Sequence, residues 1–186
     1  MTQTPARIHI VGASGSGTTT LGEALAPRIG GAHLDTDSYF WMPTDPPFTT
    51  KRPVEERLQL VGAALDRHAS WVLTGSLMGW GDVLIPRFDL VVFLLVPPDV
   101  RMARIVERER RRYGSAIDHG GAMHAAHREF LAWAASYDDP AFDGRSLTRH
   151  RAWLEALSCP VLEIDGTPTV EESVARVLAG LAKAPA

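Results

Sequence analysis

Three glycines, at positions 12, 15 and 17, lie between a β-prone run at residues 8–11 and a helix-forming run at residues 18–29. The first run reads Ile-His-Ile-Val, and the second repeats leucine or isoleucine at every fourth position until two further glycines end it. This pattern predicts a strand that passes through a glycine-rich loop directly into a helix. Such a unit is the first step of a strand–helix alternation.

The alternation continues along the chain. We expect strands at residues 8–11, 32–35, 71–73, 90–96 and 160–164, and helices at residues 18–29, 54–69, 100–113, 122–137, 147–157 and 170–181. Asp99 is expected to cap the helix at 100–113, and four prolines make residues 42–53 a loop. Five strands alternating with helices predict an α/β fold, with a parallel sheet covered by helices on both faces. Ligands of such sheets bind at the carboxyl ends of the strands.

Composition indicates one ordinary globular domain, which we expect to span residues 1–186. The net charge of −3 and the pI of about 6.1 argue against a dedicated nucleic-acid-binding protein. A single cysteine, Cys159, excludes an intrachain disulfide. Residues 1–7 lack the apolar stretch of a signal peptide, and the longest apolar run, residues 90–96, is far shorter than the roughly 20 residues that span a bilayer. We therefore expect a cytoplasmic protein with no membrane partner.

The loop after the first strand has the spacing of a phosphate-binding loop. Its pattern is glycine, four residues, glycine, a position that is usually lysine, and then serine or threonine. Backbone N–H groups and the positive end of the helix would hold an anion there, and the Thr19 hydroxyl would bind Mg²⁺. The strand before the loop and the helix after it disfavour the alternative, a glycine-rich turn with no ligand. The residues expected at the anion are Gly12, Ser14, Gly15, Ser16, Gly17, Thr18 and Thr19.

Threonine occupies the position of the usual lysine, at Thr18. A lysine ammonium about 4 Å from a phosphate oxygen contributes ~4 kcal/mol at an effective dielectric constant of ~20. Losing that charge without replacement would lower the rate or the affinity by about three decades. The only lysines in the chain are Lys51 and Lys183. Either an arginine or Lys51 replaces the missing charge, or phosphoryl transfer is weak or absent.

Several segments resemble the P-loop kinases of nucleoside monophosphates and small molecules, the family of adenylate, shikimate and gluconate kinases. The similar segments are the loop at 12–19, the acidic His-Leu-Asp-Thr-Asp at 33–37, the Trp-Val-Leu-Thr-Gly-Ser at 71–76, the arginine-rich helix after the fourth strand, and residues 161–168. The resemblance implies a three-layer P-loop NTPase fold with strand order 2-3-1-4-5. It also implies ATP and Mg²⁺ as cofactors, an acceptor-side loop at 36–53 and a lid-like segment at 110–121. Gly166 would pass the nucleotide base.

Two carboxylates, Asp35 and Asp37, follow the second strand. Residues two apart on a strand point the same way, so both are expected on one side. In kinases of the shikimate type, the first acid supports the metal and the second holds the acceptor hydroxyl. The resemblance therefore assigns Asp35 to Mg²⁺ with Thr19, and Asp37 to the acceptor. The alternative is a solvated turn, in which aspartate is common.

Four arginines of the basic helix, Arg101, Arg104, Arg108 and Arg111, have the spacing of one helical stripe. Guanidinium groups suit phosphates, although most of this stripe fits a solvated helix face equally well. We expect one or two to reach phosphate, Arg104 and Arg108 first.

Aromatic residues follow the acidic pair and recur after the third strand. Tyr39 and Trp41, and less strongly Trp80, are candidates either for stacking on an acceptor or for the core beneath the proline-rich loop. Gly75, at the end of the third strand, is expected to contact the acceptor because of the resemblance. A zinc site at His119, His124 and His127 is disfavoured, since no cysteine or acidic ligand set accompanies them.

These observations predict an enzyme that transfers the γ-phosphoryl group of ATP to a small molecule or nucleotide. Asp37, Arg104 and Arg108 are its candidate catalytic residues. The alternative is a nucleotide-binding regulatory protein that lost the chemistry with its lysine, and a plain NTP hydrolase is a third reading. No nucleic-acid partner is expected. The helices at 122–137 and 147–157 offer a face for a homodimer without demanding one.

Overall fold

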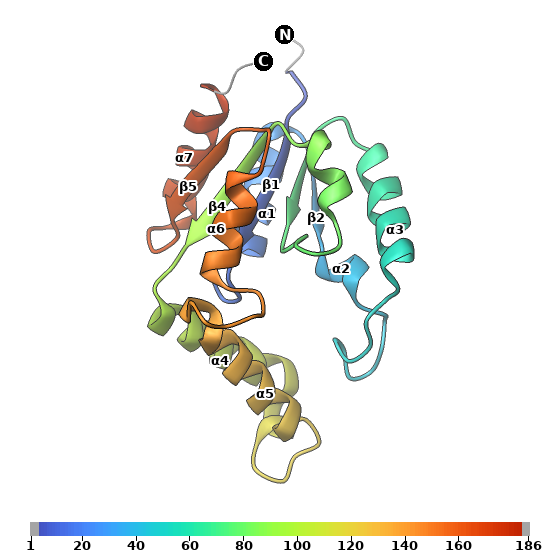
Figure 1. Cartoon of the computed structure of the whole chain (residues 1–186), viewed down its shortest axis with the longest axis vertical. Coiled ribbons are helices and arrows are strands. Elements are labelled where there is room, and N and C mark those ends of the chain that lie inside the picture. The colour runs from blue at the N-terminus through green and yellow to red at the C-terminus, as the bar shows by residue number, and fades with distance from the viewer. Residues whose placement is uncertain (1–3, 184–186) are drawn as a thin grey trace.

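The computed structural model describes residues 4–183, so part of the 1–7 segment discussed above lies outside it. Five parallel strands form one sheet, in the order β2-β3-β1-β4-β5. This confirms the predicted fold class and strand order (Figure 1). The strands are β1 (Arg7–Gly12), β2 (Ala32–Asp35), β3 (Trp71–Thr74), β4 (Leu90–Leu95) and β5 (Val161–Asp165).

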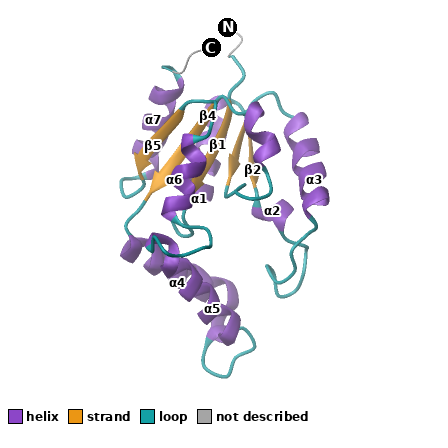
Figure 2. Ribbon diagram, viewed as in Figure 1, coloured by secondary structure: helices purple, strands orange, loops and turns teal. Residues whose placement is uncertain are grey.

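Helices connect successive strands and cover both faces of the sheet (Figure 2). They are α1 (Thr18–Leu25), α2 (Asp37–Phe40), α3 (Val54–Asp66), α4 (Pro98–Tyr113), α5 (His124–Ala135), α6 (Leu147–Glu155) and α7 (Val170–Leu181). The helix expected at 18–29 ends early, because Pro27 converts its last turn into a 3₁₀ turn at Ala26–Ile29. Asp99 is not the cap of α4, because that helix begins at Pro98 and Asp99 lies within its first turn.

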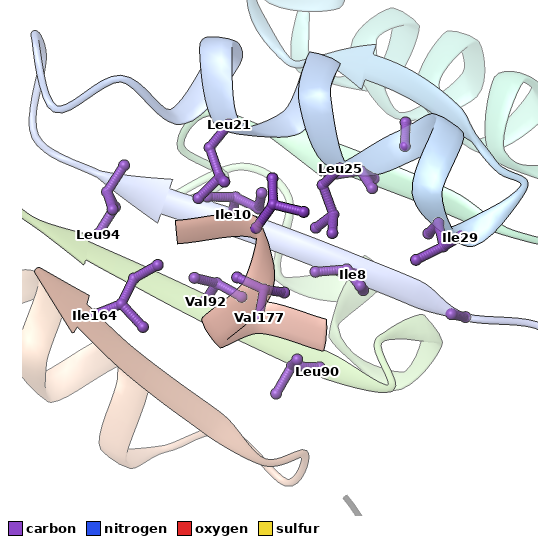
Figure 3. Close-up of a cluster of buried hydrophobic side chains, with 14 residues drawn as sticks. Ile8, Ile10, Leu21, Leu25, Ile29, Leu90, Val92, Leu94, Ile164 and Val177 are labelled. Atoms are coloured by element: carbon purple, nitrogen blue, oxygen red, sulfur yellow. The ribbon is translucent and has the colours of Figure 1, made fainter. Parts of the chain in front are cut away.

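One layer of the core lies between the sheet and helices α1 and α7 (Figure 3). Ile8 and Ile10 of β1 point into it, opposite Leu21 and Leu25 of α1. Burying a leucine or isoleucine side chain contributes about 1.5–3 kcal/mol. This layer holds the first turn of α1 beneath the glycine-rich loop.

A second layer lies on the opposite face of the sheet, under α3 and α6. Trp71, Leu73 and Phe93 leave the sheet on this side and pack against Val61 of α3 and Leu154 of α6. The central strands β1, β3 and β4 are therefore buried on both faces, which accounts for their mostly apolar sequences, whereas the edge strands β2 and β5 are partly exposed. At the carboxyl ends of the strands, α4 and α5 extend beyond the sheet (Figure 1). Within residues 4–183, no helix combines the length and the apolar character needed to cross a membrane.

Candidate functional site

The glycine-rich loop between β1 and α1 is tightly curled. Gly15 has φ +80°, and a Cβ atom built on it would lie 2.5 Å from the Arg101 carbonyl oxygen. A side chain at this position would therefore be both strained and crowded. The Ser16 N–H donates to the Ala13 carbonyl across 3.1 Å and closes the turn. The backbone thus keeps α4 close to the loop.

The first turn of α1 is open to a ligand. Its N-cap, Gly17, has φ 94° and supplies no capping side chain. The N–H groups of a first helical turn have no acceptor inside the helix, and the helix dipole makes that end positive. An anion placed at this end would therefore meet several unused donors.

Thr19 and Asp35 come together beside this turn. The Thr19 hydroxyl donates to Asp35 Oδ2 across 2.8 Å. A hydroxyl and a carboxylate side by side are the hard oxygen ligands that Mg²⁺ prefers, so the donor set fits the implied metal. Within residues 4–183, no group of three or more His, Cys, Asp and Glu side chains could hold a metal on its own. The remaining ligands of a Mg²⁺ ion would therefore be water and phosphate oxygens.

Asp37 does not continue the strand. β2 ends at Asp35, and Asp37 begins the short helix α2, so the alternation of strand side chains is the wrong reason for placing the two carboxylates together. Instead, the Asp37 N–H donates to Asp35 Oδ1 across 2.9 Å. Desolvation by surrounding protein atoms and the charge of Asp35 raise the pKa of the Asp37 carboxyl. The charges of Arg145 and Arg108 lower it.

Arg104 lies on the α1 side of the loop. Its guanidinium donates to the Ser16 carbonyl across 3.2 Å and to the Gly166 carbonyl across 3.4 Å. A cavity of about 260 Å³ adjoins these groups. It is lined by Ser16, Gly17, Thr20, Leu21, Leu94, Arg104, Gly166, Pro168, Val170 and Ser173. The two predicted residues Arg104 and Gly166 are thus brought together at a cavity that begins where the loop ends.

The other arginines of the α4 stripe have separate environments. Arg101 is 1% exposed, donates to the Val96 carbonyl across 3.1 Å and pairs with Asp138, so its role is structural. Arg108 has a buried Nε without a hydrogen-bond partner among the described residues. Its guanidinium lies 5.7 Å from the Phe130 ring centroid. The charge of Arg108 acts on Asp37, but Arg108 forms no hydrogen bond or ion pair with residues 12–19.

Sequence reasoning missed Arg145, which lies just before α6. Its Nη2 donates to the Ser14 hydroxyl of the loop across 2.7 Å, although 131 residues separate the two. The guanidinium also lies 4.9 Å from the Trp133 ring centroid. The local sequence Asp-Gly-Arg-Ser carries no ligand-binding pattern, so the only available signal was an arginine next to the helix-capping Ser146.

Two of the three aromatic candidates belong to the core. Trp80 is 9% exposed, belongs to the second core layer and donates to the Ser76 carbonyl across 3.0 Å. Tyr39 packs against the same layer, and burial raises the pKa of its phenol. Trp41 lies against Phe40, with 4.9 Å between ring centroids. Of the three, Trp41 is the one outside the core layer.

Gly75 and Arg57 pack against the segment around α2. Gly75 has φ +102°, and a Cβ atom there would lie 1.9 Å from Thr36 Oγ1. The need for glycine is therefore explained by the close approach of the chain after β2. Arg57, a second residue that sequence reasoning missed, is buried with its guanidinium 3.8 Å from the Phe40 ring centroid.

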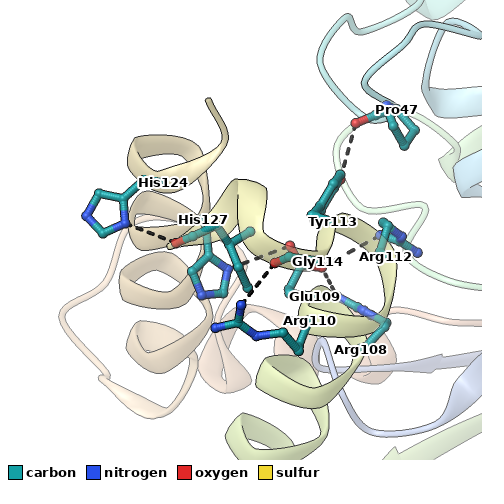
Figure 4. Close-up of polar contacts among 10 residues, drawn as sticks. Pro47, Arg108, Glu109, Arg110, Arg112, Tyr113, Gly114, His124 and His127 are labelled. Atoms are coloured by element: carbon teal, nitrogen blue, oxygen red, sulfur yellow. Dashed lines mark hydrogen bonds and ion pairs between the residues drawn. The ribbon is translucent and has the colours of Figure 1, made fainter. Parts of the chain in front are cut away.

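The end of α4 reaches across to the proline-rich loop (Figure 4). The Tyr113 hydroxyl donates to the Pro47 carbonyl across 3.3 Å. The Arg112 guanidinium lies 4.3 Å from the Phe48 ring centroid. The segments expected as acceptor-side loop and lid are therefore in contact.

Comparison with known proteins identifies a family and a relative that covers most of the chain. A family profile described as "AAA domain" matches residues 8–122, which include the loop, Asp35, Asp37 and α4. The chain belongs to this AAA-domain family. The AAA-domain chain is also 46% identical over 171 residues to the uncharacterised protein YqaC of Bacillus subtilis (strain 168), covering 92% of this chain and 94% of that one.

Solved structures of two kinases share the fold of this AAA-domain protein. The shikimate kinase of Bacteroides thetaiotaomicron matches 95% of this chain and 98% of its own, with 20% identity and a TM-score of 0.56. A gluconokinase from Sinorhizobium meliloti 1021 matches 97% of this chain and 94% of its own, with 21% identity and a TM-score of 0.53. The predicted P-loop kinase fold is therefore confirmed.

Proposed function

We propose that this protein is an ATP-dependent phosphotransferase that moves the γ-phosphoryl group to a hydroxyl of a small molecule. The observation that carries the proposal is the arrangement at the carboxyl ends of β1 and β2. The glycine-rich loop, the Thr19–Asp35 oxygen pair and the Asp37 carboxylate are gathered there around the amino end of one helix. A general anion site needs the loop but has no use for the two carboxylates.

The donor nucleotide would lie along the loop and α1. Backbone N–H groups of residues 14–19 would hold its phosphates. The cavity beside Arg104 and Gly166 would receive the nucleoside. Thr19 and Asp35 would hold Mg²⁺, which supplies charge neutralisation between the phosphates when bound.

The acceptor would lie on the other side of the loop, next to Asp37. Its hydroxyl oxygen forms a bond to the γ-phosphorus while the bond to the bridging β–γ oxygen breaks, and ADP leaves with that electron pair. Asp37 would orient the hydroxyl and accept its proton, and Arg108 would steady the transferring group. Most of the acceleration would come from positioning and charge stabilisation.

The acceptor class is supported by the structural neighbours. Shikimate and gluconate kinases, by their names, act on hydroxylated acids. We therefore propose a hydroxylated, anionic small molecule as acceptor, with nucleoside monophosphates as the second class to assay.

A coupled assay of ADP formation tests the proposal. The panel contains shikimate, gluconate, neutral sugars and nucleoside monophosphates, each with ATP and Mg²⁺, and ATP without acceptor as the blank. We expect acceptor-dependent ADP formation that Asp37→Asn lowers by at least about 100-fold. ADP formation at the blank rate with every acceptor would contradict it and identify a hydrolase instead.

The replacement of lysine by Thr18 supports a second candidate, a nucleotide-binding regulatory protein. That protein would bind Mg·ATP, as calorimetry measures, yet form no ADP with or without acceptor. Thr18→Lys would then raise activity from the blank. The phosphotransferase proposal expects measurable activity before any such change.

A further inference from the structure

Arg145 occupies a place in the site that the loop itself leaves without a cation. Thr18 has a short, uncharged side chain, so it cannot supply the positive charge that a lysine at this position would bring to the loop. Arg145, 131 residues further along the chain, donates to the Ser14 hydroxyl across 2.7 Å. Its charge also lowers the pKa of the Asp37 carboxyl, so the guanidinium that touches the loop is close enough to act on Asp37. In the proposed reaction, the phosphoryl group would move from the loop toward Asp37, which is the region that this charge reaches.

The surroundings of Arg145 hold it in place without neutralising it. Trp133 of α5 stacks on the guanidinium at 4.9 Å from its ring centroid. The next residue, Ser146, is buried and caps α6, which fixes the backbone. The Nε of Arg145 is buried and has no hydrogen-bond partner among the described residues. Burial lowers the pKa of Arg145, which is the direction expected of a cation lacking a full set of anionic partners.

The other cations of the site are placed less suitably. Arg104 uses its guanidinium on the carbonyls of Ser16 and Gly166, beside the nucleoside cavity. Arg108 lies 3.5 Å from Glu109 Oε1 and does not touch the loop. Lys51 is exposed, and its backbone pairs with Trp41 in an isolated bridge. Arg145 alone combines contact with the loop and proximity to Asp37 within residues 4–183.

We propose that Arg145 binds the transferring phosphoryl group and supplies the positive charge that a lysine at position 18 would otherwise supply. The inference rests on the proposed function. A guanidinium forms two parallel hydrogen bonds with phosphate oxygens, so it replaces an ammonium group in charge and adds directional contacts. The hydrogen bond to Ser14 would be exchanged for phosphate oxygens when the donor binds.

The test combines Arg145→Gln with Thr18→Lys. Glutamine keeps the side-chain stem but removes the charge, and its amide nitrogen ends two bonds short of the Nη2 that donates to Ser14. The rescue by Thr18→Lys is therefore the step that separates charge from loop packing. Arg151→Gln is the matched control, because Arg151 lies on α6 and pairs with the exposed Glu163. Thermal unfolding of every variant, with Arg145→Ala as a second truncation, reports any loss of fold. Binding of inorganic tripolyphosphate with Mg²⁺ is measured by calorimetry beside kcat/KM with ATP.

We expect Arg145→Gln to lower kcat/KM and tripolyphosphate affinity by at least about 100-fold, with Arg151→Gln close to wild type. Adding Thr18→Lys to Arg145→Gln is expected to restore tripolyphosphate affinity and kcat/KM to within about 10-fold of wild type. A lysine at position 18 cannot rebuild contacts with Trp133, so rescue separates a charge role from a structural one.

Two results would overturn the inference: wild-type affinity in Arg145→Gln, or no recovery on adding Thr18→Lys. Failure of the proposed function is recognised separately, in the wild-type protein alone. A wild-type protein that binds tripolyphosphate but never forms ADP would contradict the phosphotransferase, while the affinities of the variants would still decide the role of Arg145. A wild-type protein that binds neither ATP nor tripolyphosphate would overturn both.

Discussion

The Thr19 hydroxyl donates to Asp35 Oδ2 across 2.8 Å and so ties the first turn of α1 to the end of β2. Asparagine has the shape of aspartate but one acceptor oxygen, so Asp35→Asn removes the charge and keeps only one of the two bonds that Asp35 accepts from the Thr19 hydroxyl and the Asp37 N–H. Thermal unfolding of the variant reports any loss of fold. We expect the Mg²⁺ concentration for half-maximal activity to rise about 10–100-fold. A Mg²⁺ titration at fixed ATP checks this, with Asp99→Asn on the exposed start of α4 as control. Equal titrations for wild type and Asp35→Asn would show that Asp35 does not serve the metal.

Asp37 is expected to lower the stability of the folded protein at pH 7 while it supports turnover. Desolvation and the charge of Asp35 raise the pKa of the Asp37 carboxyl in the folded state. The folded state therefore disfavours the carboxylate, and the free energy of unfolding falls as pH rises above the ordinary carboxyl pKa. Asp37→Asn should therefore raise the melting temperature at pH 7 while lowering turnover. The gain in melting temperature should shrink as pH approaches 4. A variant that is less stable than wild type at pH 7 would mean that Arg108 and Arg145 outweigh the crowding.

Arg104 should distinguish a nucleoside from bare phosphates. Its contacts with Ser16 and Gly166 border the cavity beside α1. We expect Arg104→Ala to weaken ATP binding about 10-fold or more and to leave tripolyphosphate binding nearly unchanged. Calorimetry with both ligands measures the difference. An equal loss of affinity for ATP and for tripolyphosphate would show that Arg104 binds the phosphates and not the nucleoside.

Two glycine substitutions should have opposite effects on stability. Gly75→Ala places Cβ 1.9 Å from Thr36 Oγ1 at φ +102°, so it should lower the free energy of unfolding by roughly 2 kcal/mol or more. Gly62→Ala, within α3, meets nothing within 4 Å and should raise it by about 1 kcal/mol. Urea unfolding of both variants gives the comparison. Equal free energies would show that α2 yields to the new methyl group.

His9 should make the fold sensitive to mild acid. Burial lowers the pKa of this histidine to about 4, so it stays neutral in the folded state while the unfolded chain gains a proton near pH 6.5. Its contribution to stability is present above pH 6.5 and is lost as pH falls toward 4, by about 3 kcal/mol in all. His9→Phe should flatten the dependence of unfolding free energy on pH across this range. His150, whose pKa is lowered to about 3 by burial, would remain as a second source.

The local parts of the site could be predicted from the sequence. The loop at residues 12–19 and the acidic pair are contiguous segments beside strands with clear patterns, and both lie where the alternation puts them. The short helix that begins at Asp37 has too few residues to show a period, so the reason given for its placement was wrong. Tyr39 and Trp80 could equally have faced an acceptor, since aromatic residues suit both settings and only the packing of α3 decides between them.

Arg145 could not be found in this way. Its position depends on how α5 and α6 return to the sheet after α4, and no pattern within residues 143–146 reports that path. Arg104 and Arg108 were found because helical spacing alone places them on one side of α4. Side chains that meet only through tertiary structure leave little trace in one sequence.

The separation of 131 residues between Ser14 and Arg145 has a consequence for the growing polypeptide. A ribosome-bound chain that ends at residue 122 already contains everything matched by the family profile, yet lacks Arg145. If Arg145 supplies the charge, such an intermediate would contain the loop sequence but neither this cation nor the β5 and α7 residues that complete the core layer under α1. Chemistry would then begin only when the last third of the chain has emerged and folded back.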